Sequence, residues 1–167
     1  MESRALSSAS TLPRLRLLGA VGLECGDRVD ELPVERALQL LVVLACAGDW
    51  VERDRLAHLF WPDHEPDAAR RNVRKQLHRL RQWRWGSGLQ ASATRVRWAG
   101  DSDLAAFDAA VAAQDAALAL RLYRGELAPR FEVGAAPGFA QWLLAERERR
   151  ARSHQALVLR QIAATPA

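Results

Sequence analysis

The 167-residue chain is long enough for one compact domain or two small ones, and with 49% hydrophobic residues, six of them Trp, its composition excludes a disordered chain. The formal net charge of +4 is unevenly distributed, because residues 1–63 sum to −3, residues 64–100 to +7 and residues 101–167 to 0. A concentration of positive charge in one short stretch indicates a single surface that meets a polyanion.

The N-terminal part of the chain predicts a tail followed by a small sheet. Residues 1–12 are rich in Ser and Ala without an apolar core, which predicts a flexible tail and excludes a signal peptide. Residues 15–19 and 21–25 alternate partly in polarity and are followed by Gly26-Asp27, a pair typical of hairpin turns. We therefore expect two or three antiparallel strands at the start of a domain that covers residues 13–100.

Two helices are predicted next. Pro33 suits a helix start, and apolar residues then repeat at helical spacing until Gly48 closes the segment. Trp50-Val51 is expected to form a brief extended link. A second, short helix is predicted over residues 55–60 and ends where Trp61-Pro62 follows.

A third helix, predicted over residues 66–83, has one apolar and one basic face. Pro66 and Asp67 suit its first turn, where Pro breaks no hydrogen bond and an acid favours the helix dipole. With about 3.6 residues per turn, its apolar residues form one stripe that suits a core. The stripe consists of Ala69, Val73, Leu77 and Leu80. Basic residues occupy the opposite face, and a B-DNA major groove, about 12 Å wide, admits one such helix.

The basic residues divide into two expected kinds of DNA contact. Base or near-base contacts are expected from Arg71, Arg74, Lys75 and His78, because Arg and Lys match the acceptors of guanine. Phosphate contacts, which position a protein without specifying sequence, are expected from Arg70, Arg79, Arg81, Arg95 and Arg97. Some of these nine residues are expected to be surface charges that do not contact DNA. The alternative interpretation of the whole run is a solvated helix face, and an anionic membrane is a competing partner that the Ala, Val and Leu stripe suits less well.

A hairpin is predicted after the third helix, over residues 89–98, with a polar turn at residues 92–94. Alternation places Val96 and Trp98 on one face and Arg95 and Arg97 on the other. Strands, three helices with a basic third helix, and then a hairpin are the layout of a winged helix-turn-helix with an extra N-terminal sheet. The hairpin would be the wing.

The composition changes at Asp101-Ser102, whose residue types are typical of a helix cap, and this change predicts a second domain over residues 101–167. Two short Ala-rich helices, a loop with two Pro, and a long helix over residues 139–163 are expected there, and helix pairs of this kind resemble a TPR-like solenoid unit. The pairs Glu146 with Arg150 and Glu148 with Arg152 have favourable helical spacing and are expected on a solvated face. The predicted fold class is therefore α+β, a winged helix followed by a partial all-α segment.

Catalytic and cofactor sites are not indicated. His58, Asp63 and His64 lack a further ligand at metal-binding spacing, and the glycine pairs lack the pattern of a phosphate loop. No nucleophile and base arrangement of an enzyme is recognisable, so we expect no enzyme, no cofactor and no metal. The Trp residues border apolar runs and are expected in core or boundary packing, namely Trp61, Trp83, Trp98 and Trp142.

The cellular setting is expected to be cytoplasmic. Cys25 and Cys46 are too few for a disulfide framework, which indicates a reducing environment. The longest apolar run, residues 38–47, is too short to span a bilayer.

Residues 13–160 as a whole resemble the Streptomyces antibiotic regulatory protein family of transcriptional activators, which join an OmpR-like winged helix to a bacterial transcriptional activation domain. The matching segments are residues 15–19, 56–63, 69–81 and 123–127, with Asp103, Phe107, Phe139, Trp142 and Arg147. The resemblance implies that the third helix enters the major groove and that the hairpin approaches the backbone or minor groove. It also implies two copies, a possible dimer, on direct repeats of promoter DNA, and a helical part that contacts RNA polymerase or packs on the DNA-binding part.

One departure from the family is that its activation domains continue through several more helices. We therefore expect either a fragment of a larger regulator or a shortened member. The predicted function is sequence-specific, DNA-binding transcriptional regulation. The alternative is a helical-repeat scaffold for protein interactions, in which the basic face has become a docking surface for acidic partners and binds no DNA.

Overall fold

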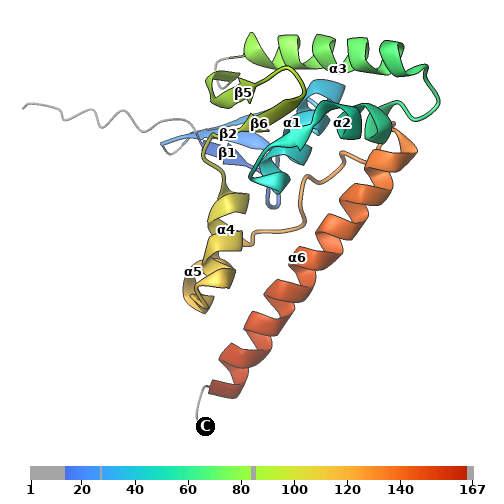
Figure 1. Cartoon of the computed structure of the whole chain (residues 1–167). Coiled ribbons are helices and arrows are strands. Elements are labelled where there is room, and N and C mark those ends of the chain that lie inside the picture. The colour runs from blue at the N-terminus through green and yellow to red at the C-terminus, as the bar shows by residue number, and fades with distance from the viewer. Residues whose placement is uncertain (1–13, 27, 84–85, 165–167) are drawn as a thin grey trace, which may run out of the picture.

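The computed structural model describes residues 14–26, 28–83 and 86–164 (Figure 1). Within these residues the chain has an α+β fold with two three-stranded antiparallel sheets and six α-helices. The tail predicted over residues 1–12 lies outside the described residues.

The first sheet opens the chain. It consists of β1 (Arg14–Arg16), β2 (Gly22–Cys25) and β3 (Arg28–Glu31) in the order β1-β2-β3. Leu15 pairs with Leu23 in the register of β1 and β2, and both side chains are buried, so one face of this sheet covers the core. Gly26 has a φ of +62°, which glycine adopts without strain, at the turn into β3. The predicted strands are present, although Asp27 of the predicted turn lies outside the described residues.

The central helix is α1 (Arg36–Ala47). Every residue from Ala37 to Ala45 is buried, which explains why the apolar run in the sequence is nearly continuous instead of one-sided. The helix ends as predicted at Gly48, whose φ of +63° is left-handed and whose N–H donates to the carbonyl of Leu44 at 3.2 Å.

The start of α1 differs from the prediction. The helix begins at Arg36 and not at Pro33, because the preceding residues still follow the first sheet. The N–H of Leu32 donates to the carbonyl of Val21 at 3.1 Å, and Glu35 retains an extended backbone.

The next helices pack beside the second sheet, whose strand order is β4-β6-β5. These elements are β4 (Val51–Glu52), α2 (Arg53–Phe60), α3 (Pro66–Arg81), the 3-10 turn η1 (Gly86–Gly88), β5 (Leu89–Ala91) and β6 (Arg95–Trp98). Helix α2 begins two residues before the predicted Arg55, because the N–H of Arg53 donates to the carbonyl of Thr94 at 2.8 Å and so joins α2 to the β5–β6 turn. Helix α3 ends at Arg81, two residues before the predicted Trp83.

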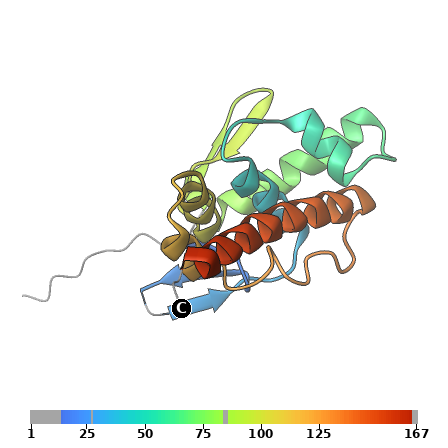
Figure 2. The same cartoon turned by 90° about the horizontal axis from the view of Figure 1, so that it is seen from below.

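Three helices complete the described chain. They are α4 (Asp103–Ala112), α5 (Ala116–Leu122) and α6 (Pro137–Ala164). The Oγ atom of Ser102 accepts a hydrogen bond from the N–H of Ala105 at 3.0 Å, so Ser102 caps α4 as the sequence predicts. Viewed from below, α4 and α5 lie beside the C-terminal half of the long helix α6 (Figure 2).

The segments before and after Ser102 share one hydrophobic core. The carboxylate of Asp103 accepts hydrogen bonds from the backbone N–H groups of Leu17 at 2.7 Å and Leu18 at 3.2 Å. Burial raises the pKa of this carboxyl, and the two backbone hydrogen bonds only partly oppose that effect. A buried carboxylate thus fastens the first sheet to the start of α4.

Helix α6 also packs closely on α2. The ring of Phe139 stacks on that of Phe60, with their centroids 5.1 Å apart. At Gly138 the two helices approach so closely that a Cβ atom would lie 2.8 Å from the carbonyl oxygen of Leu59. The N-terminal end of α6 is therefore held beside the C-terminal end of α2.

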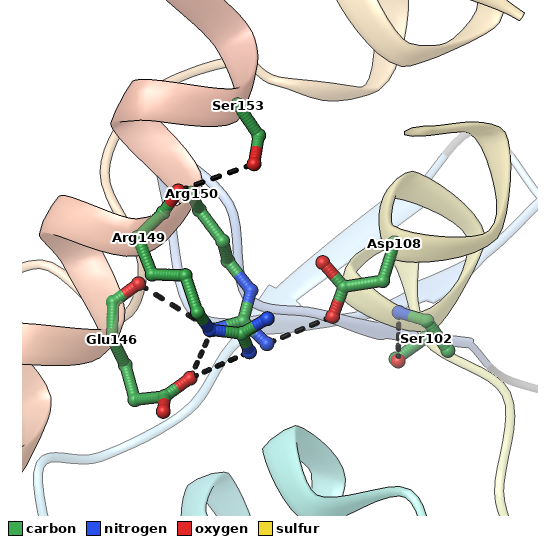
Figure 3. A network of polar contacts seen from close by, with 7 residues as sticks. Ser102, Asp108, Glu146, Arg149, Arg150 and Ser153 are labelled. Atoms are coloured by element: carbon green, nitrogen blue, oxygen red, sulfur yellow. Dashed lines mark hydrogen bonds and ion pairs between the residues drawn. The ribbon is translucent and has the colours of Figure 1, made fainter. Parts of the chain in front are cut away.

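The charges of α6 correct one sequence prediction. Arg150, expected on a solvated face, is only 1% exposed. Its guanidinium donates to the carboxylate of Glu146 at 2.5 Å and to that of Asp108 in α4 at 2.8 Å (Figure 3). Burial disfavours ionised Glu146, but hydrogen bonds from Arg149 and Arg150 outweigh burial and lower the pKa of its carboxyl. The helical spacing was predicted correctly, whereas solvent exposure was wrong for Arg150, because Asp108 of α4 lies against it.

Candidate nucleic-acid interface

The apolar stripe of α3 is buried as predicted. Ala69, Val73, Leu77 and Leu80 are between 0% and 4% exposed and belong to the common core. Figure 1 shows α3 along one end of the molecule, with no other helix or strand drawn beyond it. The stripe therefore fixes the rotation of the helix about its own axis, and the basic residues face outward.

The crest of α3, the side directly opposite the stripe, carries basic side chains. With Val73 set at 0° and about 100° per residue, Arg71 and Lys75 fall near 160° and 200°. Both are exposed, and neither has a hydrogen bond or an ion pair to another described residue. His78, near 140° on the same wheel, is also exposed, and its Nε2 lies 2.9 Å from the side-chain nitrogen of Gln82.

One flank of α3 faces α2, and there Arg70 is engaged within the protein. Its guanidinium makes two hydrogen bonds to the carboxylate of Asp54 in α2, at 2.8 and 3.0 Å, and lies 3.5 Å from Asp67. The hydrogen bond from Arg70 lowers the pKa of the Asp54 carboxyl. Arg70 thus joins the two helices, and two carboxylates already lie beside its guanidinium.

Arg74 and Arg81 lie on the same flank, near 100° and 80° on the wheel. Both are exposed, and within residues 14–26, 28–83 and 86–164 neither has a hydrogen bond or an ion pair. Arg79, on the opposite flank, forms an ion pair at 2.8 Å with Glu35, the residue that precedes α1. The α3 cations therefore differ in kind, because Arg70 and Arg79 have acidic partners and the others have none among the described residues.

The β5–β6 hairpin has the predicted alternation. Val96 and Trp98 are buried, whereas Arg95 is exposed and Arg97 is half-buried. Arg95 lies 3.4 Å from the carboxylate of Glu52. Arg97 donates to the side-chain oxygen of Gln90 at 2.9 Å. Both arginines are thus held by neighbouring strands.

Trp50 adds a cation–π contact to this hairpin. The guanidinium carbon of Arg97 lies 5.0 Å from the centroid of the Trp50 ring. Since Gln90 is neutral and an aromatic ring carries no net charge, Arg97, unlike Arg95, has no carboxylate partner among the described residues.

Arg53 is a residue of this surface that the sequence analysis missed. Its guanidinium donates to the carbonyl of Ser92 in the hairpin turn at 2.7 Å. Desolvation lowers the pKa of the Arg53 guanidinium, and the positive charges of Arg81 and Arg74 lower it further. Arg53 is the first residue of α2 and belongs to no basic run, so the sequence offers no signal for it.

Other predicted features can be placed as well. Trp98 is buried, and Trp61, Trp83 and Trp142 are partly buried against the core, which agrees with packing roles. Among the described residues, no group of His, Cys, Asp and Glu is arranged to hold a metal ion, and no helix is both long and apolar enough to cross a bilayer.

Both cysteines are free thiols. Cys25 is exposed, and burial raises the pKa of the Cys46 thiol to about 12.

Comparison with known proteins gives a structural likeness. No protein-family model matches this sequence, and no curated protein matches it. The fold is similar to that of Mycobacterium tuberculosis EmbR, solved in complex with a low-affinity phosphopeptide, with a TM-score of 0.62 and 21% sequence identity. The aligned region covers 90% of this chain and 46% of the EmbR chain, so the chain spans about half the length of EmbR. At this identity the likeness concerns the fold.

Proposed function

We propose that this protein is a sequence-specific DNA-binding transcriptional regulator in which α2 and α3 form a helix-turn-helix and the β5–β6 hairpin is its wing. Helix α3 would lie in the major groove, and the wing would approach the neighbouring backbone or minor groove. The fold likeness to EmbR and the resemblance to the Streptomyces antibiotic regulatory proteins both support this assignment.

A single observation carries the proposal. Arg71 and Lys75 project from the crest of a helix that lies at one end of the molecule, and they have no partner within the described part of the chain. The 16 residues of α3 span roughly 24 Å at 1.5 Å per residue, enough to follow a major groove about 12 Å wide across several base pairs. Cations without internal partners are the ones that gain most from phosphates and base acceptors.

The packing of α3 against the rest of the protein favours a DNA-recognition helix over a helix whose basic face is merely solvated. Its four stripe residues are buried in the common core, and ion pairs fasten α3 to α2 through Arg70 and to the start of α1 through Arg79. A helix held on both flanks presents its crest in one fixed orientation, and a fixed orientation is required for direct base contacts.

The partners implied by the sequence resemblance belong to the same proposal. Two copies on direct repeats, and contact of the helical part with RNA polymerase, follow from that resemblance. The exposed surfaces of α5 and α6 are available for such contacts, and the fold leaves the crest of α3 free at the same time.

Binding to duplexes selected from a random pool tests the proposal. We expect the wild-type chain to enrich a defined half-site and to shift that duplex, with affinity falling as salt rises. The selected sequences would also show half-site length and repeat orientation. A protein-interaction scaffold would enrich no sequence and would leave DNA unshifted even at low salt, and that result would overturn the proposal.

A further inference from the structure

The turn of the β5–β6 hairpin, the N-terminal end of α2 and one flank of α3 enclose a surface hollow of about 240 Å³. The lining consists of three arginines, two carboxylates and two small residues of the hairpin turn, namely Arg53, Arg70, Arg74, Glu52, Asp54, Ala93 and Thr94. The hollow thus lies between the proposed reading helix and the proposed wing, and no sequence motif marks it.

The chemistry of the lining favours an anion. Both carboxylates already have arginine partners, since Asp54 accepts two hydrogen bonds from Arg70, which also lines the hollow, and Glu52 pairs with Arg95. The groups that remain are hydrogen-bond donors, namely two guanidinium groups and a hydroxyl. Arg74 has no partner among the described residues.

Positive charges outnumber negative ones in the hollow, because three arginines and two carboxylates line it. Desolvation lowers the pKa of the Arg53 guanidinium, and the charges of Arg81 and Arg74 lower it further. Arg53 cannot turn away from them, because its side chain donates to the carbonyl of Ser92 and its backbone N–H to that of Thr94. Like charges held in place destabilise one another, and a bound anion would relieve that repulsion.

We infer that this hollow binds one backbone phosphate of the DNA duplex, clamped by Arg53 and Arg74, with Thr94 as a further donor. The inference rests on the proposed DNA-binding function and deepens it. It also revises the expectation from the sequence, since Arg74 becomes a phosphate contact, and Arg71 and Lys75 on the crest remain the candidates for base contacts. The hollow would fix the register of the duplex between α3 and the wing.

The test is a chemical double-mutant cycle on a duplex selected by the wild-type protein. Single phosphates of that duplex are replaced in turn by neutral methylphosphonates, and binding is measured for wild type, Arg53→Ala, Arg74→Ala and Thr94→Val. We expect Arg74→Ala to weaken binding about tenfold, because the variant loses one charge-assisted hydrogen bond to a phosphate. At one phosphate position, the neutral methylphosphonate should lower the affinity of wild type about tenfold. The same replacement should not lower the affinity of Arg74→Ala or Arg53→Ala any further.

Matched controls separate this site from its surroundings. Arg55→Ala removes an exposed arginine of α2 that does not line the hollow, and Arg71→Ala removes one on the crest. Both should stay fully sensitive to neutralisation of that phosphate. Because Arg53→Ala could release the hairpin turn, Arg74→Ala and Thr94→Val, which leave the backbone contacts intact, decide the outcome on their own.

The possible results are distinguishable. Duplex binding that depends on Arg71 and Lys75 would support the proposed function. If, in addition, the affinity lost in Arg74→Ala and the affinity lost by neutralising a phosphate are additive at every phosphate position, the phosphate clamp is overturned and the proposed function stands. If no duplex is bound, both are overturned. If inorganic phosphate binds the wild-type protein but Arg74→Ala binds the selected duplex as tightly as wild type does, the hollow is a site for a small free anion, which also overturns the clamp.

Discussion

At the scale of single residues, the basic side chains of α3 are not equivalent. Arg70 and Arg79 already have carboxylate partners, whereas Arg71 and Lys75 have none among the residues that the structure describes. An arginine that must exchange an internal partner for DNA gains less on binding than one that exchanges only water. Mutational effects should therefore follow pairing, and not merely position in the basic run.

Arg71→Ala is expected to weaken binding to a selected duplex by about 1–3 kcal/mol, the usual worth of a good base contact, with a much smaller loss on a scrambled duplex. Arg79→Ala is the matched control on the same helix, because its guanidinium is occupied by Glu35. Fluorescence anisotropy on both duplexes measures the difference. Equal losses on specific and scrambled DNA would remove Arg71 from the base contacts.

Arg150 shows the opposite situation, a buried arginine whose loss would leave its partners unpaired. Removing one member of a buried ion pair costs about 3–5 kcal/mol of stability. The cost here should be roughly 2–4 kcal/mol, because Asp108 is partly exposed and because Glu146 keeps Arg149 as a second partner. We expect Arg150→Met to lower the free energy of unfolding by this amount in urea denaturation. Arg152→Met, on the exposed side of α6, should change it by less than about 0.5 kcal/mol. Similar values for both variants would contradict the structural role.

At the scale of elements, helical spacing in the sequence was sufficient to predict α3, its apolar stripe and its outward crest. Spacing could not show what lies across from each face. The ion pairs of Arg70 and Arg79, and the contact of Arg53 with the hairpin turn, join residues 16 to 44 positions apart, so only the folded chain brings them together. For the same reason Arg150 was expected in solvent, since its partner Asp108 lies 42 residues away.

The junction between the first sheet and α4 gives a prediction about pH. Burial raises the pKa of Asp103, so its protonated form is favoured in the folded state. The stability that Asp103 contributes is therefore greatest below its ordinary pKa of about 3.9 and declines as pH rises through its higher folded value. In Asp103→Asn, the amide oxygen can accept a hydrogen bond from only one of the backbone N–H groups of Leu17 and Leu18, and the amide N–H₂ group faces the other N–H. We expect the free energy of unfolding to fall by about 1–3 kcal/mol.

Urea unfolding of wild type and Asp103→Asn across a pH series measures this dependence. The stability difference between the two proteins should be largest at acidic pH and should shrink as pH rises. Asp101→Asn, at an exposed neighbour, is the control. A difference that grows with rising pH would show that the folded protein favours the ionised carboxylate instead.

At the scale of the whole molecule, the concentration of charge in residues 64–100 predicts the salt dependence of binding. The cations of the interface without a carboxylate partner among the described residues are Arg53, Arg71, Arg74, Lys75, Arg81 and Arg97. If Arg53 and Arg74 share one phosphate and each of the others neutralises about one, log K should fall with log salt with a slope of about −4 to −5. A titration of affinity from low to moderate salt gives this slope. A value well beyond −6 would mean that the internal ion pairs open on DNA, and a value near zero would favour the scaffold.

The close approach at Gly138 has a consequence for how the molecule tolerates change. Any side chain there would meet the backbone of Leu59, which has no flexible end that could move aside, so the methyl group of an alanine would wedge the long helix away from α2. The stacked rings of Phe60 and Phe139 would part first, and they sit one residue from that point of contact on each helix. The alignment of the end of the molecule that carries α2 and α3 with its far end thus depends on a residue whose side chain is a single hydrogen atom.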